Sequence, residues 1–289
     1  MPLPVTPHGE LAEGRLLSWR RRYSPDEIAG YDALSGRVRL PEGSAPTLPD
    51  LLVVAPLTKL GGDLDYIARK MTWSHARAVG VDEELTAELE ILQLEENTGF
   101  HRIAFDARVR GNDGDVVLSG RSKGIILHVA DPAARPDVPE DAAAPALDLG
   151  AVRKAARPEA DGAPFDGPAA GAVLTATTTV TSDDIDLCTA LTGDRGAHHL
   201  GIGGDRPMAQ GLLTATTVPF VRGDRGFRYR SMSMVFLQPV HAGDVVTSEV
   251  TVTDADPAGE LSLKASVRNQ DGTEVFVSEC TGVLPDAAG

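Results

Sequence analysis

Residues 181–193 read TSDDIDLCTALTG, and residues 24–36 read SPDEIAGYDALSG. In both stretches a Ser or Thr precedes acidic residues, apolar residues recur at helical spacing, and a glycine closes the run. A hydroxyl at the start can cap free N–H groups, acids favour the positive end of a helix, and glycine is preferred just past its other end. Each stretch therefore predicts one helix, ending near Gly36 in the first case and near Gly193 in the second.

The spacing between the two stretches is constant. Asp26 and Asp183 are 157 positions apart, and so are Gly36 and Gly193. A fixed offset between similar segments is the sequence signature of a repeat. The two helices are therefore predicted to occupy equivalent places in two copies of one unit.

Strand-like segments surround each predicted helix. Residues 14–23 and 171–180 precede the two helices, and the second segment is rich in Thr and Val, as strands are. Farther along, Asp113-Gly114 and Asp271-Gly272 are hairpin-turn pairs 158 positions apart. Further strands are predicted at residues 85–94 and 100–109 in the first copy, and at residues 245–253 and 261–267 in the second. One duplicated unit is the most economical explanation of this order.

The segment between the copies has a different composition. Residues 130–170 are dominated by Ala, Pro, Asp and Gly, which is typical of a connector. We therefore divide the chain into an N-terminal unit, residues 1–129, this linker, and a C-terminal unit, residues 171–289. The predicted fold class is α+β, with two similar units in tandem, and a different duplicated α+β sandwich would also fit the pattern.

Composition narrows the set of partners. The net charge of −15 argues against a nucleic-acid partner, because phosphate binding needs a cationic surface. No run is apolar for long enough to span a membrane, and the N-terminus lacks the pattern of a signal peptide, so we expect a cytoplasmic protein with no membrane association. Cys188 and Cys280 have no metal-binding spacing, and we expect neither a metal nor a cofactor.

The residues that carry chemistry follow the second predicted helix. Asp194 and His199 lie five positions apart on a predicted loop, where an acid and a base can converge. Gly211 opens another predicted helix, whose N-terminus would offer free N–H groups and a partial positive charge to an oxygen atom. An acid, a base and a group that stabilises an oxyanion are thus expected within one segment.

Three motifs appear in a familiar order. Gly193-Asp194 precedes His199, a Gly-Leu-Leu helix start follows at Gly211, and residues 238–244 read QPVHAGD. The sequence resembles the MaoC-like, (R)-specific enoyl-thioester hydratases and dehydratases. The resemblance implies a double hotdog, in which each of two tandem units wraps an antiparallel sheet around a long central helix. It also implies that Asp194 and His199 are the catalytic pair, and that the Gly211 N–H binds the thioester carbonyl.

The first unit is predicted to lack this chemistry. The positions 157 residues before Asp194 and His199 are Arg37 and Glu42, which are neither the acid nor the base. We therefore expect one active site per chain. In two-unit relatives the inactive half shapes the acyl tunnel, so residues 51–60 and 66–73 are candidates for its wall.

The sequence departs from the family beside the catalytic Asp. The family usually has Asn-Pro where this chain has Gly196 and Ala197. Loss of the Asn side chain should leave open space near the nucleophile, and Arg195 could pair with a carboxylate. These residues and His198 define a predicted nucleophile pocket, which motivates an alternative reaction: addition of an amine or amino acid such as glycine to an enoyl thioester, giving a β-amino acyl product.

The resemblance implies an enzyme that adds or removes water at the β-carbon of an acyl thioester. Its partner would be an acyl-CoA or an acyl carrier protein thioester, and we allow for a homodimer. Two further alternatives are a hotdog thioesterase, which would direct water at the carbonyl carbon, and an acyl-binding protein without catalysis.

Overall fold

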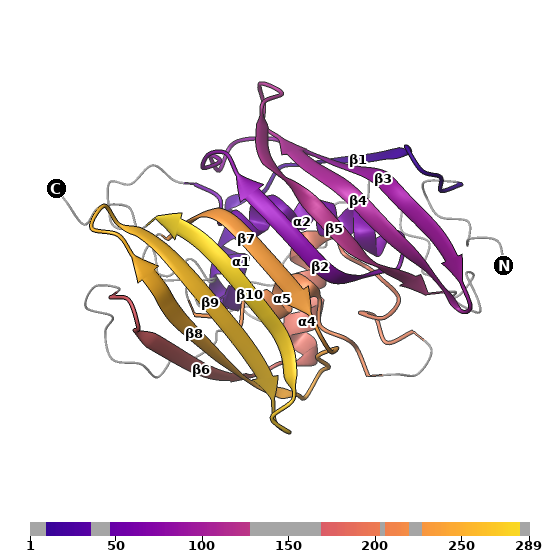
Figure 1. Ribbon diagram of the computed structural model, residues 1–289. Helices are drawn as coiled ribbons and strands as arrows, with labels where there is room; N and C mark the ends of the chain where they lie inside the picture. Colours follow the sequence, from indigo (N-terminus) through magenta and orange to yellow (C-terminus); the bar gives the residue numbers. More distant parts are fainter. Residues whose placement is uncertain (1–9, 36–46, 128–168, 203–205, 220–226, 284–289) are drawn as a thin grey trace.

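The computed structural model describes residues 10–35, 47–127, 169–202, 206–219 and 227–283. Within these ranges the strands form one antiparallel sheet of 10 strands in the order β1-β3-β4-β5-β2-β7-β10-β9-β8-β6 (Figure 1). The strands of the first unit are β1 (Leu16–Arg21), β2 (Tyr66–His75), β3 (Leu85–Asn97), β4 (Phe100–Arg110) and β5 (Val116–Leu127). Those of the second are β6 (Val173–Thr179), β7 (Arg228–Phe236), β8 (Val245–Ala255), β9 (Glu260–Asn269) and β10 (Glu274–Val283).

The order of the elements repeats. In the described ranges each unit has one strand, two helices and then four strands. The helices are α1 (Pro25–Ser35) and α2 (Asp50–Gly62) in the first unit, and α4 (Ser182–Thr192) and α5 (Gly211–Ala215) in the second. The bounds of α1 and α4 have the 157-residue offset expected from the sequence. The duplication predicted from sequence is therefore present in the topology.

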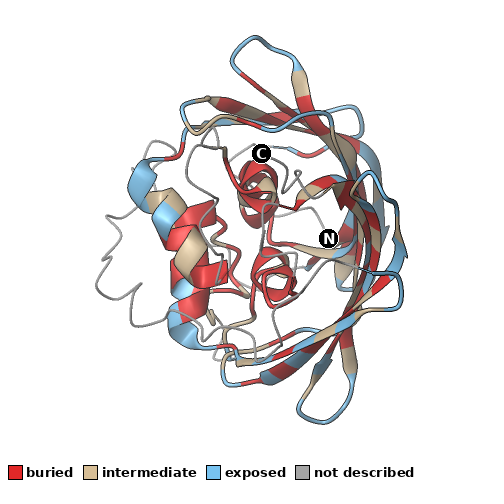
Figure 2. Ribbon diagram, turned by 90° about the vertical axis from the view of Figure 1, so that its left-hand side faces the viewer, coloured by how far each residue is buried: buried red, intermediate tan, exposed pale blue. Residues whose placement is uncertain are grey.

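The two half-sheets join at their central strands. β2 pairs with β7 antiparallel, from Lys70 opposite Val235 to Ser74 opposite Ser231. This pairing makes a single sheet, which curves around the helices and carries all of them on its concave face (Figure 2). Side chains from both units therefore meet beneath the β2–β7 junction.

The strand sequences explain why one face of the sheet is buried. On β3, Leu85, Ala87, Leu89 and Ile91 are buried, and the residues between them are more exposed. Successive strand residues point to opposite faces, so this alternation directs the apolar set toward the helices. The other face of the sheet lies toward solvent (Figure 2).

The helix α4 has the ends that the sequence predicts. Thr181 and Asp184 form a capping box, in which the Thr181 hydroxyl accepts the Asp184 N–H and the Asp184 carboxylate accepts the Thr181 N–H. Such a cap contributes about 1 kcal/mol. Gly193 ends the helix in the left-handed conformation at φ 73°. The chain therefore turns sharply just before the loop that carries Asp194.

The central helices differ in length between the units. α2 has 13 residues and is apolar on nearly all sides, with Leu52, Val54 and Leu60 fully buried. α5 has only 5 residues, so the long central helix expected in the second unit is short. The hydroxyls of Thr216 and Thr217 donate to carbonyls three residues earlier, at 2.7 Å each. Such bonds compete with helical ones, and β-branched residues disfavour a helix.

Two expectations lie largely outside the described ranges. Residues 130–168 of the predicted linker are not among them, nor are Arg37 and Glu42 of the first unit. In the part of the chain that is described, no helix has both the length and the apolar character needed to cross a membrane.

Candidate active site

The loop after α4 brings the predicted acid and base together. The Nε2 atom of His199 lies 3.6 Å from Oδ2 of Asp194, and the two side chains are only 5 % and 10 % exposed. This distance is longer than a hydrogen bond, so the two atoms are not hydrogen-bonded to each other. Both residues line the same cavity.

The ring of His199 is oriented by its other nitrogen. Nδ1 lies 2.7 Å from the carbonyl oxygen of Met208. A carbonyl can only accept, so Nδ1 carries the proton and donates it, and in the neutral ring Nε2 keeps its lone pair. Nε2 is the nitrogen that faces Asp194. His199 can therefore exchange a proton on the cavity side while its orientation stays fixed.

The position of Met208 is set in turn by the segment before β8. The Met208 N–H donates to the carbonyl of His198 at 2.9 Å, and the Ala209 N–H donates to the carbonyl of Val240 at 2.8 Å. Val240 belongs to the QPVHAGD stretch at residues 238–244. This stretch therefore stabilises the segment of Met208 and Ala209, whose Met208 carbonyl orients the ring of His199.

Asp194 is held by backbone groups of its own loop. Its N–H donates to the Thr192 hydroxyl at 3.1 Å, and its Oδ1 accepts the N–H of Gly196 at 3.3 Å. These bonds direct Oδ2 toward His199 and leave it without another protein donor among the described residues.

The first unit braces this loop from the C-terminal end of α2. A Cβ on Gly62 would lie 2.1 Å from Oδ1 of Asp194, so only glycine allows the carboxylate to pack there. Asp65 accepts the N–H of Ala197 at 2.8 Å and is 2 % exposed. Its φ of 51° is the one positive value at a non-glycine residue in the described part of the chain. Sequence reasoning missed both residues, because no local motif marks them.

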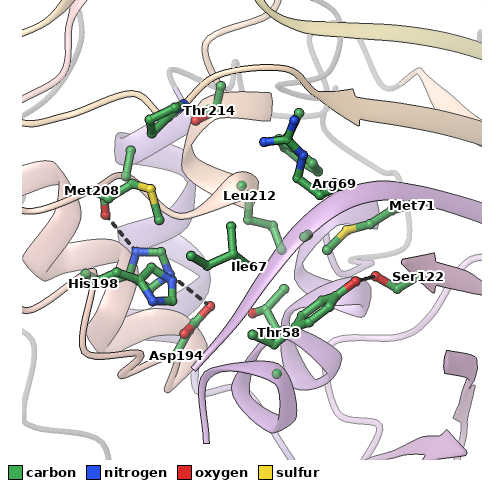
Figure 3. A pocket seen from close by; sticks show the side chains of 18 of the residues that line it. Thr58, Ile67, Arg69, Met71, Ser122, Asp194, His198, Met208, Leu212 and Thr214 are labelled. Atoms are coloured by element: carbon green, nitrogen blue, oxygen red, sulfur yellow. Dashed lines mark hydrogen bonds and ion pairs between the residues drawn. The ribbon is translucent and has the colours of Figure 1, made fainter. Parts of the chain in front are cut away.

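A cavity of about 290 Å³ opens onto the pair. Its lining comes from both units, and most of it is apolar. The first unit contributes Leu57, Thr58, Gly61, Tyr66, Ile67, Ala68, Arg69, Met71, Trp73, Leu89, Phe105, Ser122, Ile125 and Leu127. Of the segments predicted as the tunnel wall, residues 66–73 line the cavity beside Asp194 at most positions, whereas residues 51–60 do so only at Leu57 and Thr58 (Figure 3).

Gly211 lies at the start of α5 and also lines the cavity. The first residues of a helix have no partner within the helix for their N–H groups. The ring of Phe236 packs against Gly211, and a Cβ added there would lie 2.9 Å from its Cζ. A glycine at this position therefore leaves room for the aromatic ring against the start of the helix.

The predicted nucleophile pocket is only partly correct. His198 lines the cavity, but Arg195, Gly196 and Ala197 do not. The expectation of open space at Gly196 is wrong, because a Cβ there would lie 2.6 Å from the His198 ring. The imidazole of His198 occupies the volume that an Asn side chain at position 196 would fill.

The pattern Gly-x-Ser-x-Gly occurs at residues 120–124, which is typical of the nucleophile elbow of a hydrolase. Here it lies inside β5 and not at a strand-to-helix turn. The Ser122 hydroxyl is hydrogen-bonded to the Tyr66 hydroxyl at 2.6 Å, with no histidine base in this contact. The pattern therefore does not form a hydrolase triad.

The equivalent helix start in the first unit carries a carboxylate that is bonded to other residues of the protein. α2 begins at Asp50, which corresponds to Gly211 in the order of elements. The Asp50 carboxylate accepts the N–H of Tyr229 at 2.8 Å and pairs with Arg228 at 3.4 Å. A carboxylate at this place would repel a developing oxyanion, which agrees with a single active site per chain.

Comparison with known proteins bears on the fold. The sequence matches no protein-family model and no curated protein. A conserved protein of Mycobacterium tuberculosis described as a double hotdog superposes with a TM-score of 0.71 at 19 % identity, covering 94 % of this chain and 96 % of that one. A MaoC domain protein dehydratase from Chloroflexus aurantiacus gives 0.71 at 15 % identity, with 99 % of each chain covered. A MaoC-like dehydratase from Phytophthora capsici gives 0.60 at 11 % identity, over 94 % and 97 %. The chain therefore has the double hotdog fold, in the form seen in MaoC-like proteins.

Proposed function

We propose that the protein adds water to, or removes it from, the β-carbon of an acyl thioester. The observation that carries this proposal is the 3.6 Å approach of His199 Nε2 and Asp194 Oδ2 at the edge of a largely apolar cavity. An acid and a base at this separation can both contact one water molecule. The apolar walls suit a hydrocarbon chain and exclude bulk solvent.

Each part of the site has a task in this reaction. One member of the pair takes a proton from water as the water oxygen bonds to the β-carbon, and the other delivers a proton to the α-carbon. Between these events the thioester carbonyl oxygen becomes negative. We assign the stabilisation of this charge to the N–H of Gly211 at the start of α5, because a fixed donor gains most where charge develops. Elimination of water is the same path in reverse.

The structural neighbours support this reading. Two of the matched proteins are described as dehydratases, and they share the fold along nearly the whole chain. The acyl thioester, the water chemistry and the roles of Asp194, His199 and Gly211 are our proposal for this protein.

The direct test uses crotonyl-CoA and a medium-chain trans-2-enoyl-CoA as probes, with products identified by mass. Gain of one water with the thioester intact is the expected result. Release of free CoA would instead indicate a thioesterase, and binding with no product would indicate an acyl-binding protein. Either of these two outcomes contradicts the proposal.

A further inference from the structure

The apolar cavity contains a group of polar atoms that the proposed reaction does not use. They are the Tyr66 hydroxyl, the Ser122 hydroxyl and the indole N–H of Trp73, and all three residues line the cavity. Their exposed fractions are 9 %, 3 % and 3 %. Tyr66 and Trp73 lie on β2 and Ser122 on β5, so the group belongs to the wall that the first unit provides.

The backbone of β5 is shaped around these side chains. A Cβ on Gly124 would lie 2.6 Å from the Tyr66 ring, and a Cβ on Gly120 would lie 2.6 Å from the Trp73 ring. Ser122 lies between the two glycines on the same face of the strand. The Gly-x-Ser-x-Gly pattern thus lets two aromatic rings lie close to the strand on either side of one hydroxyl.

Two donors of this group have no acceptor among the described residues. Tyr66 and Ser122 bond to each other at 2.6 Å, which uses one of their two hydroxyl protons. Neither hydroxyl has another partner among the described residues. The Trp73 Nε1–H has no partner there either. Burial raises the pKa of Tyr66, so its phenol stays protonated and neutral. One hydroxyl proton and the indole N–H are therefore buried without an acceptor among the described residues.

We propose that this group binds a neutral oxygen atom on the acyl chain, such as that of a ketone, hydroxyl or ether, beyond the carbons that react. The inference rests on the proposed function, because it takes the occupant of the cavity to be an acyl thioester. A plain hydrocarbon chain would displace water and leave both donors unpaired, which is costly in a buried site. A neutral oxygen supplies the missing acceptor.

A carboxylate fits the group less well than a neutral oxygen. The one Lys or Arg that lines the cavity in the described ranges is Arg69, and its side chain is exposed to solvent. A buried anion beside Tyr66 and Trp73 would have no cation to balance it. The chemical class selected is therefore an uncharged, oxygenated acyl chain.

The test measures binding, by calorimetry, of saturated acyl-CoA probes that cannot react. Decanoyl-CoA is compared with analogues that carry one ketone or ether oxygen at successive positions from C5 outward. At least one analogue should bind about tenfold more tightly than decanoyl-CoA, which is the effect expected from satisfying a buried donor. Equal or weaker binding of every analogue would overturn the inference.

Variants then locate the effect. The double change Tyr66→Phe with Ser122→Ala removes both hydroxyls, and Trp73→Phe removes the indole N–H but keeps an aromatic ring over Gly120. Each should reduce the ratio of the affinity for the oxygenated chain to the affinity for decanoyl-CoA. Ser278→Ala is the matched control, because Ser278 is a buried serine on β10 that does not line the cavity. A preference that survives in both cavity variants would contradict the assignment.

The outcomes separate this inference from the proposed function. Hydration of an enoyl-CoA together with no preference for oxygen overturns only the inference. A clear preference in binding without any hydration supports the inference and contradicts the water chemistry. Failure of every acyl-CoA to bind overturns both.

Discussion

Asp65 of the first unit accepts the backbone N–H of Ala197 in the second unit at 2.8 Å. The two residues are 132 positions apart, and this bond ties the end of α2 to the loop that carries Asp194 and His199. Gly62 packs against Asp194 from the same helix end. The first unit therefore contacts the loop of Asp194 and His199 as well as lining the cavity, and we expect these contacts to fix the shape of the loop.

Asp65→Ala should therefore lower kcat with little change in KM. It leaves the Ala197 N–H without its acceptor, and a displacement of about 1 Å in a catalytic group can cost about a hundredfold in rate. Asp65→Asn is the matched control, because it keeps an oxygen acceptor and tolerates a positive φ. Steady-state kinetics should show recovery of most of kcat in the Asn variant. Equal loss in both variants would show that the hydrogen bond is not the cause.

Gly211→Ala should reduce turnover strongly. The added Cβ would lie 2.9 Å from Cζ of Phe236, so either that ring or the start of α5 must shift. Loss of a single oxyanion donor costs about a hundredfold to a thousandfold in kcat. Adding Phe236→Leu makes room for the methyl group and should restore part of kcat. A double variant no better than Gly211→Ala would argue against a role for the Gly211 N–H.

Glycine should not compete with water. The space that an amine was expected to use beside Gly196 is filled by the ring of His198. With an enoyl-CoA and saturating glycine, mass spectrometry should find the water adduct alone. His198→Ala, which empties that space, is the informative comparison. A β-amino acyl product from the unaltered protein would restore the amine reaction as the better account.

Acid should destabilise the fold in part through His75. Burial lowers the pKa of His75 from its ordinary 6.5, an effect that the nearby Arg228 reinforces and Asp50 opposes. The unfolded chain therefore binds this proton more readily than the folded one, so stability present above pH 6.5 is lost as the pH falls below it. Urea unfolding of His75→Phe should show a weaker pH dependence between pH 6.5 and 5. An unchanged slope would mean that His75 does not contribute.

The local parts of the site were predictable from sequence, and the distant parts were not. Asp194, His199 and Gly211 lie within one segment of the sequence. A capping box begins the preceding helix α4, and Gly193 ends it just before Asp194. Asp65 is distant in sequence and contacts the site only in the folded protein. Ser122 lies in a Gly-x-Ser-x-Gly pattern, which is typical of hydrolases with another fold. The error at Gly196 arose because a missing side chain does not predict a cavity when a neighbouring ring can turn into the space.

Asp194 and His199 are proposed to move the protons of a reaction at the β-carbon. The most direct measurement is kcat for hydration of a medium-chain enoyl-CoA by the unaltered protein, Asp194→Asn and His199→Ala, with Asp183→Asn on the exposed start of α4 as control. Each site variant should lose about a hundredfold to ten-thousandfold in kcat while melting like the parent, and Asp183→Asn should be unaffected. Near-normal turnover in either site variant would contradict the claim.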